Sequence, residues 1–107
     1  MANIQDSLKQ LLGDSVGLIK DDFKDLLKAT KADTSDFIKN QGKDLEKYVA
    51  ALAKKDISKG EFEDLVTGLV SLDRIEYQRL SATVKVRAQE VANKIAELAL
   101  DGLMKMV

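Results

Sequence analysis

An eleven-residue repeat of charged and apolar residues most constrains what this chain can fold into. The charged members of the repeat are Lys9, Lys20 and Lys31, then Asp14, Asp25 and Asp36, and finally Asp22, Asp33 and Asp44. Its apolar members include Leu26, Phe37 and Tyr48, together with Leu27, Ile38 and Val49. Eleven residues make close to three turns of α-helix, so each series follows one side of a helix. The repeat therefore predicts an all-α coiled-coil protein, whose long amphipathic helices lie straight or wind slightly to the right.

The composition bounds the class of protein without indicating a reaction. The chain has 107 residues, enough for a single domain over 1–107, and its formal net charge is −1. This balance does not favour nucleic acid as a partner, because phosphate binding needs an excess of basic residues. The N-terminal residues lack the pattern of a secretory signal, and no run of about 18 apolar residues predicts a transmembrane segment. We therefore expect a soluble protein, located by default in the cytoplasm.

Several side chains on which catalytic and metal sites depend are missing from the sequence. There is no histidine and no cysteine, so the commonest general base and the usual soft metal ligands are absent. The glycines are scattered and form no phosphate-binding loop. We expect no enzyme activity, no catalytic residues, no cofactor and no metal site.

A turn at residues 55–58 is the main interruption in the sequence. Ser58 and Glu61 have the spacing of a capping box, in which each side chain accepts a hydrogen bond from the backbone N–H of the other residue. Ile57 and Phe62 stand at the flanking positions of a hydrophobic staple. The chain has no proline to break a helix elsewhere. It therefore predicts two long helices, at about 3–54 and 59–105, joined as an antiparallel hairpin.

Folding the chain at residue 57 pairs the apolar stripes of the two helices, with partner numbers that sum to 114. The predicted partners are Leu52 and Phe62, Tyr48 and Val66, Leu45 and Leu69, Phe37 and Tyr77, Phe23 and Val91, and Ile19 and Ile95. The same register pairs Gln41 with Asp73, so that two polar residues form one layer of the apolar interface. Such a polar layer costs stability while fixing the alignment of the helices.

The segment 30–36 is the weakest part of the first predicted helix. Thr30 and Thr34 fall on its apolar stripe, and Asp33 or Thr34 is a suitable N-cap for a new helix. A break at 31–35 would give a three-helix arrangement in place of the two-helix hairpin.

The charged residues of the first helix separate to the two flanks of its apolar stripe, at about 100° of rotation per residue. One flank collects the lysines Lys9, Lys20, Lys24, Lys28 and Lys31. The other flank collects the aspartates Asp14, Asp22, Asp25, Asp33, Asp36 and Asp44. One positive and one negative edge favour packing beside other helices, whereas the acidic edge disfavours an anionic lipid surface.

The second helix has apolar residues on two faces, and its own chain can cover only one of them. The residues predicted to form an oligomer interface on the other face are Leu72, Ile75, Ala82, Val86, Leu100 and Met104. We therefore expect a homo-oligomer, either a closed bundle or an open array, and a structural protein that self-assembles through its helices.

Two further functions fit the same amphipathic pattern. One is a peripheral protein that coats a lipid or polymer-granule surface with its apolar stripes. The other is an adaptor that captures a partner helix against the seam from Leu72 to Val86.

Overall fold

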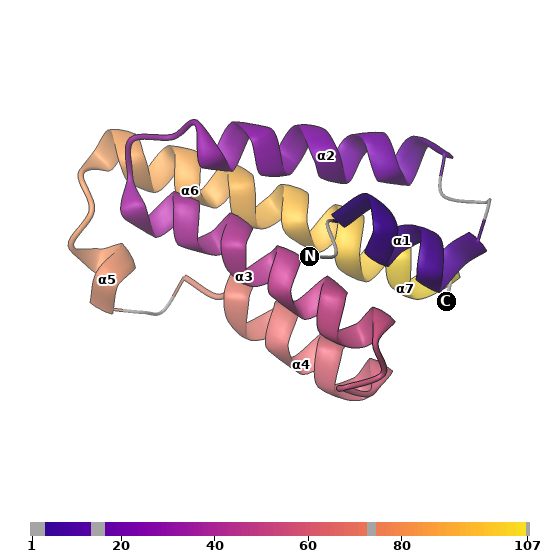
Figure 1. Cartoon of the computed structure of the whole chain (residues 1–107). Helices are drawn as coiled ribbons and strands as arrows, with labels where there is room; N and C mark the ends of the chain where they lie inside the picture. The colour runs from indigo at the N-terminus through magenta and orange to yellow at the C-terminus, as the bar shows by residue number, and fades with distance from the viewer. Residues whose placement is uncertain (1–3, 14–16, 73–74, 107) are drawn as a thin grey trace.

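The computed structural model describes residues 4–13, 17–72 and 75–106, and all regular elements in those ranges are helical (Figure 1). In chain order these elements are α1 (Ile4–Leu12), α2 (Gly17–Lys31), α3 (Asp36–Ala53), α4 (Lys59–Val70), α5 (Ile75–Gln78), α6 (Ala82–Ile95), η2 (Ala96–Leu103) and α7 (Met104–Met106). The π-helical segment η2 continues directly from α6 and leads directly into α7. This arrangement confirms the predicted all-α class.

The prediction of one helix over about 3–54 is wrong, because three shorter helices occupy that part of the chain. Gly13 follows α1 with a φ of 66°, a left-handed conformation that glycine adopts easily and that ends a helix. A second break lies between α2 and α3, within the 31–35 segment of the alternative prediction. The N-cap of α3 is Ser35, rather than Asp33 or Thr34.

The prediction of one helix over about 59–105 is wrong as well. After α4 the backbone becomes extended at Ser71, with φ −70° and ψ 130°. Helix α6 begins after Ser81, whose Oγ accepts a hydrogen bond of 3.3 Å from the N–H of Val84. Serine side chains bind nearby backbone groups and so favour helix ends over helix interiors. The short helix α5 lies between these two points.

The turn between α3 and α4 contains the predicted capping box. The Oγ of Ser58 accepts from the N–H of Glu61, and the carboxylate of Glu61 accepts from the N–H of Ser58, each over 3.1 Å. Phe62 is fully buried in the core, and Ile57 packs against the same core. The residues proposed as cap and staple therefore fix where α4 begins.

Helix α3 ends in a Schellman motif just before this capping box. The N–H of Asp56 donates to the carbonyl of Ala51 over 2.9 Å, and the N–H of Lys55 donates to that of Leu52 over 3.1 Å. Lys55 has a φ of 63°, in the left-handed region that glycine usually occupies in this motif. The motif satisfies two carbonyl groups that the helix end would otherwise leave unpaired.

Helix α3 lies at the centre of the bundle, where it contacts α1, α2, α4 and α6 (Figure 1). Fully buried side chains from four helices meet in one hydrophobic core, among them Phe23, Leu45, Phe62 and Ile95. The molecule measures 40 × 25 × 25 Å. A hairpin of two unbroken helices would instead be roughly 70 Å long, at about 1.5 Å per residue.

At the start of α3, the pairing of the two halves of the chain agrees with the predicted register. The rings of Phe37 and Tyr77 have centroids 6.1 Å apart and an interplanar angle of 48°. This aromatic pair joins α3 to α5 and was expected from the fold of the chain at residue 57.

Farther from the turn, the pairing shifts along the second half of the chain. Asp33 pairs with Arg87, six positions beyond the residue that the predicted register places opposite it. A Cβ built on Gly102 lies 3.1 Å from the Cδ1 of Ile19, although the predicted partner of Ile19 is Ile95. The shift arises because the breaks at 32–35 and 71–81 differ in length. Beyond them, the two arms of the predicted hairpin no longer advance residue for residue.

Helices α2 and α3 approach each other closely where Gly42 faces Thr30. A Cβ built on Gly42 would lie 2.8 Å from the Cβ of Thr30, closer than side chains normally approach. Thr30 is fully buried, and its hydroxyl donates to the carbonyl of Leu27 over 2.9 Å. The glycine therefore lets these two helices pack against each other.

Candidate functional site

A groove between α1, α2 and α3 forms the first candidate surface, called here the basic groove. It has a volume of about 530 Å³ and is lined by Ile4, Lys24, Leu27, Lys28, Lys31, Ala32 and Glu46. The side chains of Ile4 and Leu27 are buried, whereas the three lysines are exposed. The groove therefore combines apolar walls with a positively charged rim.

The spacing of the lysines places them together on α2. Lys24, Lys28 and Lys31 are four and three residues apart, so they share one flank of the helix. The Nζ of Lys31 lies 3.3 Å from a carboxylate oxygen of Glu46 on α3. Lys24 and Lys28 form no ion pair with any of the described residues. The lysine flank expected from the sequence thus borders the basic groove, and two of its lysines form no ion pair among the described residues.

A second hollow lies between α3 and α5 and is called here the acidic hollow. It has a volume of about 480 Å³ and is lined by Asp36, Phe37, Asn40, Asp44, Glu76 and Leu80. Three of these six residues are carboxylates, and none is basic. Nearby, the Nζ of Lys85 lies 5.7 Å from the centroid of the Tyr77 ring, where a cation is attracted to the ring face.

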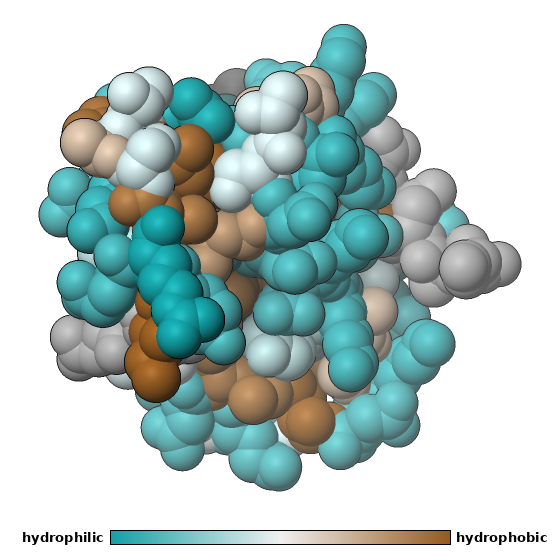
Figure 2. Space-filling model, turned by 90° about the vertical axis from the view of Figure 1, so that its left-hand side faces the viewer, coloured by the Kyte–Doolittle hydropathy of each residue, from teal (hydrophilic) through white to brown (hydrophobic). Residues whose placement is uncertain are grey.

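Large apolar side chains are exposed on α5 and α6. Ile75 is 66% exposed and Val86 is 56% exposed, followed by Leu65 of α4 at 38%. Figure 2 shows the end of the molecule that carries α5 and the start of α6, where hydrophobic patches alternate with hydrophilic ones. Ile75 and Val86 belong to the predicted oligomer interface, and neither is part of the hydrophobic core of its own chain.

The other residues of the predicted interface do not share one face. Leu100 and Met104 pack against the core of their own chain. Leu72 follows α4 and is half-buried, whereas Ala82 begins α6 and is exposed. The seam from Leu72 to Val86 is therefore divided between segments rather than continuous along one helix, because the chain breaks at 71–81.

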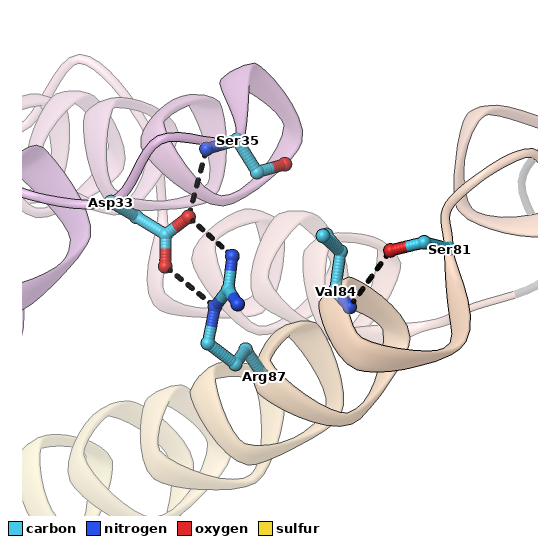
Figure 3. A network of polar contacts seen from close by, with 5 residues as sticks. All are labelled: Asp33, Ser35, Ser81, Val84 and Arg87. Atoms are coloured by element: carbon cyan, nitrogen blue, oxygen red, sulfur yellow. Dashed lines mark hydrogen bonds and ion pairs between the residues drawn. The ribbon is translucent and has the colours of Figure 1, made fainter.

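An ion pair joins the loop between α2 and α3 to α6 (Figure 3). The Nε of Arg87 donates to Oδ2 of Asp33 over 3.0 Å, and its Nη2 donates to Oδ1 over 3.2 Å. Oδ1 also accepts a hydrogen bond of 2.8 Å from the N–H of Ser35. Two parallel bonds to one carboxylate give the pair a fixed geometry, for which arginine is better suited than lysine.

These hydrogen bonds change the acidity of Asp33. The bond from Arg87, and then that from the N–H of Ser35, hold the pKa of the Asp33 carboxyl below its ordinary value. The sequence prediction did not include Arg87. The available signal was that arginine occurs only at 74, 79 and 87, whereas every other basic residue is lysine.

The predicted polar layer of Gln41 and Asp73 is only half described, because Asp73 lies outside the described residues. Gln41 is 1% exposed, and neither its Oε1 nor its Nε2 has a hydrogen-bond partner. A buried amide without partners costs stability, which agrees with the expected cost of a polar residue at this position.

Two absences among the described residues concern metal and membrane binding. No group of three or more acidic residues in the described ranges is arranged to hold a metal ion. None of the helices in the same ranges has the length and apolar character to cross a membrane.

Comparisons with known protein families, with curated proteins and with solved structures found no match to this chain. The described residues form an all-α helical bundle that carries the basic groove and the acidic hollow.

Proposed function

We propose that this protein is a non-catalytic assembly protein that self-associates through the part of its surface formed by α5 and α6. The observation that carries the proposal is the exposure of Ile75 and Val86, at 66% and 56%. Each is a large apolar side chain whose burial against a neighbour would stabilise a complex by about 1–2 kcal/mol. Single exposed apolar residues are common, but these two are close in the sequence, with Ile75 on the short helix α5 and Val86 near the start of α6.

The face of α6 that bears Val86 points away from the core of its own chain. Ala88, Ala92 and Ile95 form the buried face of the helix, and Val86 lies on the opposite side at about 100° per residue. An exposed β-branched residue contributes little to the stability of a monomer. Its presence there is more easily explained if a second molecule covers it.

The test replaces both exposed residues with aspartate, as Ile75→Asp/Val86→Asp. The wild type is expected to show a mass above that of a single chain of 11.8 kDa in light scattering at high micromolar concentration. The double variant is expected to run as a single chain with unchanged helical circular dichroism, because neither position is part of the core.

A matched control places the same two charges on exposed polar positions of the same helices, as Gln78→Asp/Gln89→Asp. This control is expected to keep the mass of the wild type. The proposal is wrong if the wild type is a monomer at every concentration tested, or if the control dissociates as readily as the Ile75→Asp/Val86→Asp variant.

A second candidate function is attachment to an anionic lipid or polymer-granule surface. The basic groove favours it, since lysines at the rim of an apolar groove suit contact with head groups and acyl chains. Co-sedimentation with vesicles containing anionic lipid tests it. The expected result is a bound fraction that Lys24→Glu/Lys28→Glu abolishes, and no bound wild type at low salt would contradict it.

A further inference from the structure

We propose that copies of this chain join head to tail, with the α5 edge of one copy seated in the basic groove of the next. The α5 edge comprises Ile75, Glu76 and the acidic hollow that lies between α5 and α3. The inference rests on the proposed self-association and deepens it, since it names the two surfaces that meet.

Charge is the first argument for this pairing. The basic groove presents Lys24 and Lys28 without ion-pair partners among the described residues, and the acidic hollow presents three carboxylates without a basic residue in its lining. The two surfaces therefore carry opposite charge in a chain whose net charge is only −1. Opposite potentials on two partners speed their encounter and fix their orientation.

Apolar contact is the second argument. Ile75 is 66% exposed and directly precedes Glu76, so an apolar side chain stands beside a carboxylate on the same short helix. The basic groove offers the complementary combination of an apolar side chain beside positive charge, since Leu27 stands between Lys24 and Lys28 in the sequence of α2. Its volume of about 530 Å³ is larger than one isoleucine side chain needs.

The same charges disfavour contact between two like surfaces. A two-fold contact between α5 edges would bring two sets of carboxylates together, and a two-fold contact between basic grooves would bring lysines together. Like charges placed opposite each other cost binding free energy and suppress that arrangement. A contact between the two different surfaces remains. It closes as a dimer where two copies exchange it reciprocally, and it produces a ring or a filament where each copy uses its two surfaces on different neighbours.

The first experiment reverses the charge of the groove with Lys24→Glu/Lys28→Glu, which moves the net charge from −1 to −5. Its matched control, Lys43→Glu/Lys47→Glu, makes the same change at exposed positions of α3 outside the groove. Sedimentation velocity at low salt is expected to show a single chain for the groove variant, with at least a ~10-fold weaker self-association. The control is expected to sediment like the wild type.

The second experiment reverses the charge of the acidic hollow with Asp44→Lys/Glu76→Lys, and Glu63→Lys/Asp64→Lys serves as its control at exposed positions of α4. This edge variant is expected to sediment as a single chain when alone. When it is mixed with the groove variant, each reversed surface meets a partner of opposite charge, and assembly is expected to return. An interface between two like surfaces involves only one of the two altered sites, so the other variant would then assemble alone like the wild type.

The outcomes separate this inference from the proposed function. If the wild type assembles and the groove variant assembles equally well, or if the mixture stays monomeric, the head-to-tail contact is wrong while self-association stands. If the wild type is a monomer throughout, both are wrong. If the wild type is a monomer and its groove lysines are needed for binding to anionic vesicles, the groove serves a lipid surface and the inference is overturned.

Discussion

At the residue scale, two glycines in helices show how packing decides the effect of the same substitution. Gly42→Ala places a methyl group against buried Thr30, with the two Cβ atoms 2.8 Å apart, and is expected to cost about 1–3 kcal/mol through overpacking. Gly68→Ala adds a methyl group where no atom lies within 4 Å, and is expected to stabilise α4 by about 0.5–1 kcal/mol. Urea denaturation measures both. A Gly42→Ala variant as stable as Gly68→Ala would contradict the close approach of α2 and α3.

Lys55 provides a second prediction at this scale. Its left-handed φ of 63° strains a side-chain-bearing residue, so Lys55→Gly is expected to raise the free energy of unfolding by about 1 kcal/mol. Lys54→Gly is the control, because Lys54 has a right-handed helical conformation in which glycine costs entropy without relieving strain. Thermal unfolding of both variants decides the question. Equal destabilisation by the two substitutions would show that the Schellman motif is not formed.

At the scale of elements, the pair of Asp33 and Arg87 ties the loop after α2 to α6 and predicts a dependence on pH. The pKa of Asp33 is lower in the folded state than its value of about 3.9 in the unfolded chain. The stability that this carboxylate contributes is therefore fully present above the unfolded pKa and is lost as the pH falls through the folded pKa. Asp33→Asn is expected to destabilise the protein by about 1–2 kcal/mol at neutral pH.

The measurement compares urea denaturation of the wild type and Asp33→Asn between pH 7 and pH 2. The difference between them is expected to shrink as the pH falls below about 4, since protonation of Asp33 removes the charge that binds Arg87. Asp36→Asn serves as a control on a nearby exposed aspartate. A difference that stays constant over the whole pH range would exclude the ion pair as its source.

The same elements show which parts of the fold the sequence could predict. The capping box of Ser58 and Glu61 was predictable because all of its bonds form within four residues. The pairing of Phe37 with Tyr77 followed from counting outward from that turn. Beyond it, new helices begin after the N-cap positions Ser35 and Ser81, where the eleven-residue repeat predicts a continuous helix. Ending a helix and starting a new one at a cap differs in free energy by only about 1 kcal/mol from continuing the helix for a few residues. Packing of the whole bundle therefore decides between the two.

The candidate surfaces were predictable only in part, for the same reason. The lysine flank of α2 and the apolar character of Ile75 and Val86 follow from helical periodicity. The basic groove needs Ile4 of α1 beside α2, and the acidic hollow needs Glu76 of α5 beside α3. The first contact depends on the break after α1, which the sequence does not predict, whereas the second follows from the predicted register that pairs Phe37 with Tyr77.

At the scale of the whole molecule, the breaks in the two predicted long helices allow their apolar residues to form one core, instead of an extended apolar stripe along each helix. The radius of gyration is 13.4 Å, close to the ~13 Å typical of a compact chain of this length. Leu100 and Met104 illustrate the change, since they were expected on an oligomer interface but pack against the core of their own chain. Much of the apolar surface that indicated an oligomer is thus covered within the monomer, and Ile75 and Val86 remain exposed.

Self-association through those remaining residues predicts a melting temperature that depends on protein concentration. Only the folded chain can associate with other copies. Mass action therefore stabilises the folded wild type as its concentration rises. Each 1 kcal/mol gained in this way raises the melting temperature of a domain of this size by about 4–8 °C. The Ile75→Asp/Val86→Asp variant is expected to melt at one temperature over the whole concentration range, equal to that of the dilute wild type, since both positions lie outside the core. Scanning calorimetry over a hundredfold range of concentration measures the effect. A wild-type melting temperature independent of concentration would mean that the bundle is complete as a single chain, with its exposed apolar residues left to solvent.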